Sequence, residues 1–82
     1  MADFELSVEH VRAARALLKW TQEELAQRAG VTPNTINFWE NERTRPSEET
    51  KLQVRKAFEE AGIVFSNGKN PGVQLFRENR PN

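Results

Sequence analysis

The sequence contains no cysteine. A disulfide framework and a thiolate metal site are therefore both excluded, and a reducing cytoplasm is the simplest environment for the protein. The first twenty residues lack the continuous apolar run of a signal peptide. No segment approaches the roughly 20 apolar residues that a membrane span requires. We therefore expect a cytoplasmic protein with no membrane partner.

An excess of charge of either sign is also missing, because 12 Lys and Arg residues balance 12 Asp and Glu residues. This balance argues against a generic polyanion binder, since a strongly basic composition is the usual footprint of nucleic-acid affinity. The 82 residues suffice for one domain with a modest core and are too few for a large enzyme. An apolar fraction of 37% indicates that this chain folds.

Helical periodicity and capping residues are what the sequence does contain. Four helices are predicted, each preceded by a Ser or Thr that can accept a hydrogen bond from a free backbone N–H group. Thr21 and Glu24 have the spacing of a capping box. The N-caps are Ser7, Thr21, Thr32 and Ser47, and the expected helices cover about residues 8–19, 21–29, 33–42 and the segment from Ser47 to Gly62.

The residues after Gly62 have a different pattern. Two short apolar runs, 63–65 and 73–76, flank a loop rich in Asn, Gly and Pro, which predicts a β-hairpin. We therefore divide the chain into a helical domain over residues 1–62, a hairpin over 63–76 and a tail over 77–82. The expected fold class is mainly α, with a short C-terminal hairpin.

The second and third predicted helices are joined by a turn too short to keep them antiparallel. They must cross at a steep angle, and the small residues Ala26 and Gly30 stand at the expected crossing. Ile36 and Trp39, three residues apart, then point into that angle and bury their side chains there. The opposite face of the third helix is left for whatever the domain binds.

Two asparagines on this outward face suggest what that partner is. A DNA major groove admits one α-helix, and an asparagine carboxamide can both donate to and accept from the adenine edge. Asn34 and Asn37 have the position for this role, and Phe38 could contact a thymine methyl group. The alternatives are a solvated helix face for the asparagines, and a core or subunit contact for Phe38.

The stretch "TQEELAQRAGVTPNTINFWENERTRPS" resembles the helix-turn-helix of the phage repressor/Cro family, also called XRE-type regulators. The shared features are a Gln at the start of the second helix, the Ala-Gly at the turn, the Ile and Trp of the third helix, and the Pro-Ser before the fourth. With the preceding "RAAR", the resemblance covers about residues 11–63. It implies a four-helix, lambda-repressor-like DNA-binding domain.

Carried over position by position, the resemblance implies three sets of residues. An ion pair between Arg15 and Glu40 would tie the first helix to the end of the third. Base contacts are implied for Thr32, Pro33, Asn34, Asn37 and Phe38. Phosphate contacts are implied for Gln22, Asn41, Arg43, Thr44 and Arg45.

Two positions depart from the family pattern. Glu42 stands where the family usually has glycine after the recognition helix, so we expect the backbone to stay helical for longer and to displace Arg43. Lys51 occupies a usually apolar position of the fourth helix, which predicts a small local change in packing.

One helix-turn-helix reads only a few base pairs, so useful selectivity in a genome generally needs two linked copies. We expect a homodimer in which two hairpins form a shared sheet, because a lone two-stranded hairpin is marginally stable and its edges invite pairing. The residues expected to join the copies are Ile63, Phe65, Val73 and Leu75. The alternative is that the hairpin covers the fourth helix within one subunit.

The sequence therefore predicts a sequence-specific, double-stranded DNA-binding transcription regulator, most simply a repressor that occupies a palindromic operator as a homodimer. No catalytic group, metal site or cofactor is expected, and His10, the only histidine, is interpreted as a surface residue. The competing hypothesis is an interaction module, such as an antitoxin or adaptor, that binds another protein through Phe38, Leu52 and the hairpin.

Overall fold

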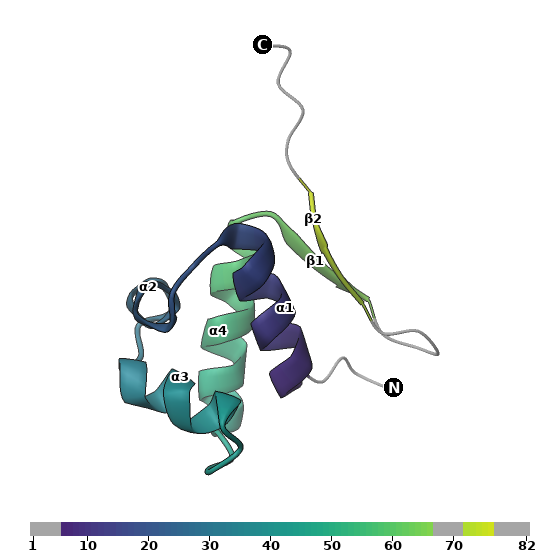
Figure 1. Ribbon diagram of the computed structural model, residues 1–82. Helices are drawn as coiled ribbons and strands as arrows, with labels where there is room; N and C mark the ends of the chain where they lie inside the picture. Colours follow the sequence, from purple (N-terminus) through teal and green to yellow (C-terminus); the bar gives the residue numbers. More distant parts are fainter. Residues whose placement is uncertain (1–5, 67–71, 77–82) are drawn as a thin grey trace.

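The computed structural model describes residues 6–66 and 72–76. Four helices are followed by an antiparallel two-stranded sheet (Figure 1). This order confirms the expected fold class. The hairpin turn at 67–71 and the expected tail at 77–82 lie outside the described residues. The elements are α1 (Val8–Leu18), α2 (Gln22–Ala29), α3 (Pro33–Glu40), α4 (Glu48–Glu60), β1 (Ile63–Ser66) and β2 (Gly72–Leu75).

Each helix begins at the expected N-cap, whose side-chain oxygen accepts a hydrogen bond from the backbone three residues later. At Ser7 the capping box is reciprocal, because the imidazole Nδ1 of His10 accepts from the Ser7 N–H at 3.2 Å. At Thr21 only the hydroxyl half forms, and the Glu24 carboxylate lies 3.5 Å from the guanidinium of Arg28 instead. His10 is thus a half-buried capping residue, and the capping role is what its interpretation as a surface residue did not include.

The core lies where the four helices meet under the sheet. Phe58 is fully buried and stacks against Trp20, with ring centroids 5.7 Å apart. Phe58 also contacts the ring of Phe65 on β1, at 6.1 Å between centroids in an edge-to-face arrangement. Aromatic pairs in this geometry stabilise the core beyond the gain from burying their surface area. The largest fully buried side chains are those of Phe58, Leu25, Ile36, Ile63, Val11 and Val54.

The turn between α2 and α3 brings these helices together at an angle. Gly30 adopts φ +77°, the left-handed conformation that glycine reaches without steric cost, and the Val31 N–H donates to the Ala26 carbonyl at 3.0 Å. Thr32 then caps α3 and Pro33 occupies its first position, where a missing N–H costs nothing. α3 therefore starts immediately after α2 and crosses it.

α3 ends at Glu40, two residues before the expected boundary. The chain leaves the helix through Glu42, which has φ +57°. The Arg43 N–H donates to the Phe38 carbonyl at 2.8 Å, and the Glu42 N–H donates to the Trp39 carbonyl at 2.9 Å, the two bonds of a Schellman motif. The expectation of a longer helix was therefore wrong, because Glu42 adopts the left-handed conformation in which the family places glycine.

The hairpin packs against its own subunit. Ile63 pairs with Leu75 and Phe65 with Val73, and all four side chains turn toward α1 and α4. Gly62, with φ +103°, allows the chain to turn from α4 into β1 close to Phe76. A Cβ at this position would lie only 2.9 Å from the Phe76 carbonyl oxygen. The packing of these side chains fits the alternative in which the hairpin covers helices of its own subunit. Their role as dimer contacts remains a prediction.

Two further features concern the outer surface. Lys51 keeps its ammonium Nζ 3.0 Å from the Glu48 carboxylate, so α4 accommodates a lysine at this position through an ion pair. None of the helices within residues 6–66 and 72–76 has both the length and the apolar character needed to cross a bilayer.

Candidate nucleic-acid interface

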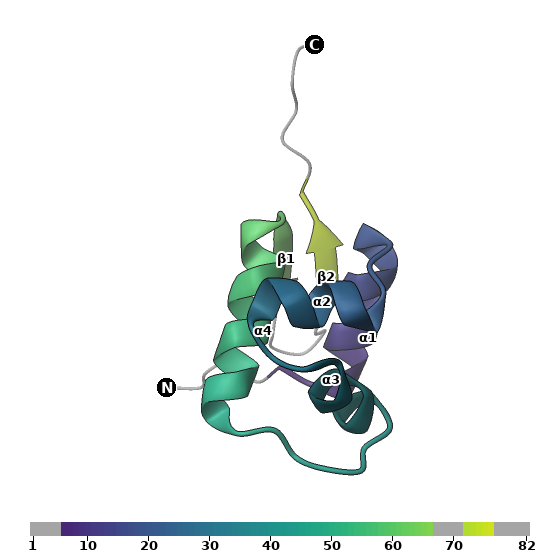
Figure 2. The same cartoon turned by 90° about the vertical axis from the view of Figure 1, so that its left-hand side faces the viewer.

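α3 presents its polar side outward, as its periodicity requires. Ile36 is fully buried and Trp39 is 4% exposed, which fixes one side of the helix against the core. Pro33 and Asn34 are exposed, and Phe38 is 37% exposed. Figure 2 shows α2 and α3 together on the side of the molecule that faces the viewer. The two asparagines differ in exposure: Asn34 is exposed and Asn37 is half-buried.

Asn37 is held by a side-chain network that connects α3 to the start of α2. Its Nδ2 donates to the Oε1 of Gln22 at 3.2 Å, and its Oδ1 accepts from the Nδ2 of Asn41 at 3.3 Å. A carboxamide has two N–H donors and two acceptor lone pairs. One donor and one lone pair of Asn37 therefore stay available, which is the combination that an adenine edge requires.

The same network reaches a buried ion pair. Gln22 Nε2 donates to the Glu40 carboxylate at 3.0 Å. Arg15 donates to both carboxylate oxygens of Glu40, from Nε at 2.7 Å and from Nη2 at 2.8 Å, and it donates from Nη1 to the Trp20 carbonyl at 2.8 Å. Glu40 is 4% exposed. Arg15 and Glu40 thus form the pair that the resemblance implies, and the pair joins α1, the start of α2 and the end of α3.

The ionisation of this pair follows from its surroundings. Burial on its own raises the pKa of the Glu40 carboxyl, but hydrogen bonds from Arg15 and Gln22, together with the nearby positive charges of Arg15 and Arg12, lower this pKa below its ordinary value. The hydrogen bond from the Arg15 guanidinium to Glu40 raises the pKa of Arg15. Both groups therefore stay charged, and the network keeps its geometry near neutral pH.

Arg12 is a residue of this region that the sequence-based reasoning missed. It is exposed on α1, and its guanidinium donates to the backbone carbonyl of Glu40, where the last turn of α3 has no helical partner. A cation at a helix C-terminus also interacts favourably with the helix dipole. The spacing of Arg12 and Arg15, three residues apart on α1, was the signal that both could reach the same helix end.

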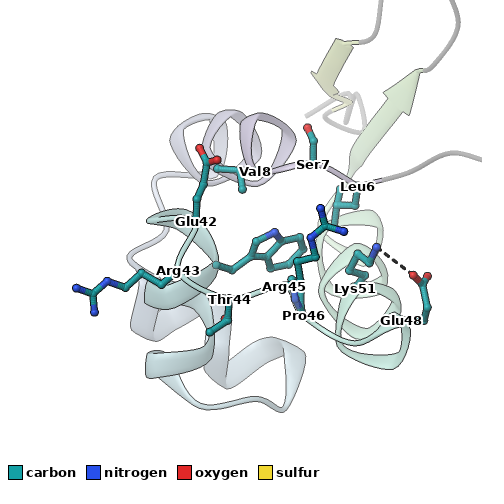
Figure 3. Close-up of a pocket in the computed structure, with 11 residues that line it drawn as sticks. Leu6, Ser7, Val8, Glu42, Arg43, Thr44, Arg45, Pro46, Glu48 and Lys51 are labelled. Carbon is teal, nitrogen blue, oxygen red and sulfur yellow. Dashed lines mark ion pairs between the residues drawn. The ribbon is translucent and has the colours of Figure 1, made fainter.

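The loop that follows α3 carries the remaining candidates. Arg43, Thr44 and Arg45 are all exposed. Figure 3 shows that Arg43 points away from the hollow under this loop, whereas Arg45 lies back beside Leu6. The two arginines thus diverge. Arg43 lies three residues beyond the end of α3 and is the more outward of the two.

Most of the expected residues lie on α3 or on the loop that follows it. Thr32 is exposed, but its hydroxyl already caps the helix by accepting from the Thr35 N–H at 3.2 Å. Gln22 is half-buried in the network. The roles of all ten residues in base and phosphate contacts stay predictions.

Comparison with known proteins supports this assignment. A family model described as helix-turn-helix matches residues 11–61. The solution structure of the DNA-binding domain of the P22 C2 repressor (residues 1–76), determined by nuclear magnetic resonance, is similar at 34% sequence identity and a TM-score of 0.60. The similarity covers 71% of this chain and 76% of that one. No curated protein matched.

The family match extends over more than half of the chain and includes α2, the turn and α3. The network of Arg15, Glu40, Gln22 and Asn37 lies within it. The chain therefore belongs to the phage repressor (XRE-type) family of helix-turn-helix, DNA-binding transcription regulators.

Proposed function

We propose that this protein binds a specific double-stranded DNA operator as a homodimer and represses transcription by occupying a promoter. The observation that carries the proposal is the pair of amides on α3. Asn34 is exposed, and Asn37 is oriented by Gln22 while keeping one donor and one acceptor available. An oriented amide on an outward helix face is suited to reading base edges.

In this proposal α3 enters the major groove, with Asn34 and Asn37 toward adenine edges and Phe38 toward a thymine methyl group. Thr32 and Pro33 lie at the N-terminal end of α3, next to the bases that this end approaches. Gln22, Asn41, Thr44 and the two arginines of the loop contact the flanking phosphates. Phosphate contacts fix the register of the helix, and base contacts specify the sequence.

The zero net charge shapes the expected binding behaviour. With no general positive field, affinity for arbitrary DNA depends on a few local cations, of which Arg43 is the most outward in Figure 3. Each phosphate neutralised on duplex DNA contributes a slope of about 0.9 to the fall of log affinity with log salt. We therefore expect a shallow slope and a correspondingly large dependence on base contacts.

Two copies on a palindrome follow from the limited reach of one recognition helix. A dimer places two α3 helices on successive major grooves, about 34–36 Å apart, and it multiplies the selectivity of a single half-site. The proposal of repression is the simplest consequence, because an occupied promoter is closed to polymerase without any further activity of the bound protein.

Two alanine substitutions test the assigned roles. Asn34→Ala should lower affinity for the selected operator by about tenfold and leave binding to unrelated duplexes nearly unchanged. Arg43→Ala should weaken binding to both. Gln27→Ala, at an exposed position of α2, serves as the control and should change neither. Fluorescence anisotropy at several salt concentrations measures all three, and equal losses for Asn34→Ala on every duplex would contradict base reading by this residue.

A second function remains supported by exposed apolar residues outside α3. Leu52 on α4 is 63% exposed, and a module that binds another protein would use such positions. A flat salt response on the best available duplex would favour this class. A Leu52→Ser variant that binds the operator normally, as we expect, would place Leu52 outside DNA recognition.

A further inference from the structure

The outer edge of β2 presents unpaired backbone groups. The Phe76 N–H donates to the Gly62 carbonyl at 2.7 Å, so this pair is a hydrogen-bonded one in the ladder. Hydrogen-bonded pairs alternate along an antiparallel ladder. With the observed register, the backbone N–H and C=O groups of Gln74 therefore point toward β1. The N–H and C=O groups of Val73 and Leu75 point away from β1, to the outer edge. No backbone partner for them lies within residues 6–66 and 72–76.

The space beside the beginning of this edge is open. A groove of about 390 Å³ runs between α1 and the beginning of β2, and Ala13, Gly72 and Val73 belong to its lining. The small side chain of Ala13 and the missing side chain of Gly72 leave room next to the strand. An accessible edge with unpaired groups is a template for another strand.

We infer that this strand is β2 of a second copy, which pairs antiparallel across a two-fold axis that passes beside Gln74. This inference rests on the proposed function for the requirement of two copies. In this register Val73 exchanges both N–H···O=C bonds with Leu75 of the second copy, and symmetry repeats the exchange. Every unpaired backbone group of the described edge then has a partner. A second copy supplies these partners in the same geometry to both edges at once, which closes the pairing in a dimer.

Phe76 supports the same register. This residue follows β2 directly, and its large apolar side chain is 65% exposed. When the two-fold axis passes beside Gln74, Phe76 lies opposite Gly72 of the second copy, on the outer face of the sheet. An aromatic ring packed over a cross-strand glycine compensates for the missing glycine side chain. The pairing thus covers an apolar ring that one subunit leaves in water.

The position of the sheet suits a DNA-binding dimer. In Figure 1 the hairpin lies to the right of α1 and α4, whereas α2 lies to their left, and in Figure 2 it lies behind the helices, on the side opposite α2 and α3. An axis perpendicular to the sheet turns the second copy within the plane of the sheet. It therefore places both α3 helices on the same side of the dimer, where one DNA duplex can meet them. In this arrangement the side chains assigned from sequence stay packed against their own subunit, and the backbone edge of β2 makes the joint.

A single cysteine tests this register, because the natural chain has none. Across the axis the two Gln74 residues form a non-hydrogen-bonded pair, with Cα atoms about 4.5 Å apart, which lies within disulfide range. We expect Gln74→Cys to give a covalent dimer under mild oxidation, while Gln27→Cys on exposed α2 stays mainly uncrosslinked. Equal rates of crosslinking for the two variants would overturn the inference.

Charge reversal provides an independent readout that does not depend on oxidation. Gln74→Glu and Gln74→Lys should each weaken self-association by about fivefold, since like charges face each other across the axis. A mixture of the two should restore association as a heterodimer, as measured by sedimentation equilibrium. Because Gln74 is exposed, neither change should unfold the subunit, and thermal unfolding of each variant checks this. Unchanged association in both variants would overturn the inference.

The failure of this inference is distinguishable from the failure of the proposed function. A chain that sediments as a dimer and selects a palindrome, yet gives no Gln74→Cys crosslink, would overturn the β2 joint and leave operator binding intact. If a different protein occupies the outer edge of β2, the Gln74→Cys variant would crosslink only to that protein. This result would also overturn the joint between two copies. Monomeric binding to a single half-site would overturn both the joint and the dimeric part of the proposed function.

Discussion

The side chain of Gln22, in the first turn of α2, holds the carboxamide of Asn37 on α3 through a hydrogen bond of 3.2 Å. Gln22 also donates to Glu40, the buried member of the ion pair with Arg15. The amide that we propose to face DNA is thereby attached, through Gln22, to the ion pair that fixes the helices to each other. Orientation before binding reduces the entropy that recognition must otherwise expend.

Removing Gln22 should therefore affect specificity. We expect Gln22→Ala to lower affinity for the selected operator by about tenfold, because the amide of Asn37 loses its fixed orientation. Binding to unrelated DNA should change less, since it loses only the one phosphate contact proposed for Gln22 and no base contact. Anisotropy titrations of Gln22→Ala, with Gln27→Ala as the control, measure the difference. An equal loss on every duplex would show instead that Gln22 acts only at a phosphate.

Breaking the buried ion pair from one side should cost much of the stability. Arg15→Ala leaves the carboxylate of Glu40 buried without its main partner, and we expect the free energy of unfolding to fall by about 3–5 kcal/mol. The double variant Arg15→Met, Glu40→Met should lose less, because no buried charge remains. Urea unfolding followed by circular dichroism measures both. A loss below about 1 kcal/mol for Arg15→Ala would contradict this role of the pair.

Stability should fall in two steps as the solution is acidified. Burial removes solvent from the imidazole and lowers the pKa of His10 below its ordinary value of 6.5, partly opposed by the charge of Glu9. In addition, its Nδ1 can accept from the Ser7 N–H only when it is unprotonated. The unfolded chain then binds the proton more readily, so the contribution of His10 is complete above pH 6.5 and is lost as pH falls below it. Glu40 follows the same sign at lower pH. Its contribution is complete above its ordinary pKa of 4.5 and is lost as pH falls through the lower folded value.

Urea midpoints measured from about pH 8 to about pH 3 resolve the two steps. His10→Asn should remove the upper step and keep the lower one, since asparagine can still accept at the cap and does not titrate in this range. A midpoint that is constant between about pH 7 and about pH 5 in the natural chain would contradict the role of His10.

The left-handed residue after α3 offers a stabilising substitution. Glu42 has φ +57°, which disfavours any side chain with a Cβ, and glycine reaches this conformation freely. We expect Glu42→Gly to raise the free energy of unfolding by about 0.5–1 kcal/mol and the midpoint of thermal unfolding by several degrees. Glu42→Ala is the matched control and should give no such gain. A lower midpoint for Glu42→Gly would contradict the interpretation.

The comparison of sequence and structure separates local from distant determinants. Some features depend only on neighbours in the chain. The residue types predicted the N-caps Ser7, Thr32 and Ser47 and the left-handed exit at Gly30, and periodicity predicted the burial of Ile36 and Trp39. The end of α3 was predicted wrongly, because side-chain propensity at Glu42 is overridden by the Schellman bonds that Arg43 and Glu42 make to the helix.

The polar network required information that a helical wheel does not contain. A wheel shows that Asn37 points away from Ile36, but its bond to Gln22 joins residues fifteen positions apart and depends on the crossing of α2 and α3. Arg12 and its contact with the end of α3 depend on the same packing. The hairpin was predicted as an element, whereas the face that it turns inward is decided by its docking on α1 and α4.

Selection of bound duplexes from a random pool tests sequence reading by α3 most directly. We predict that the natural protein enriches one inverted repeat, with half-site centres about 10 base pairs apart, and that Asn34→Ala loses the preference at one position of each half-site. A pool that shows no enriched motif after repeated rounds, with a protein that remains folded, would contradict recognition by Asn34 and Asn37.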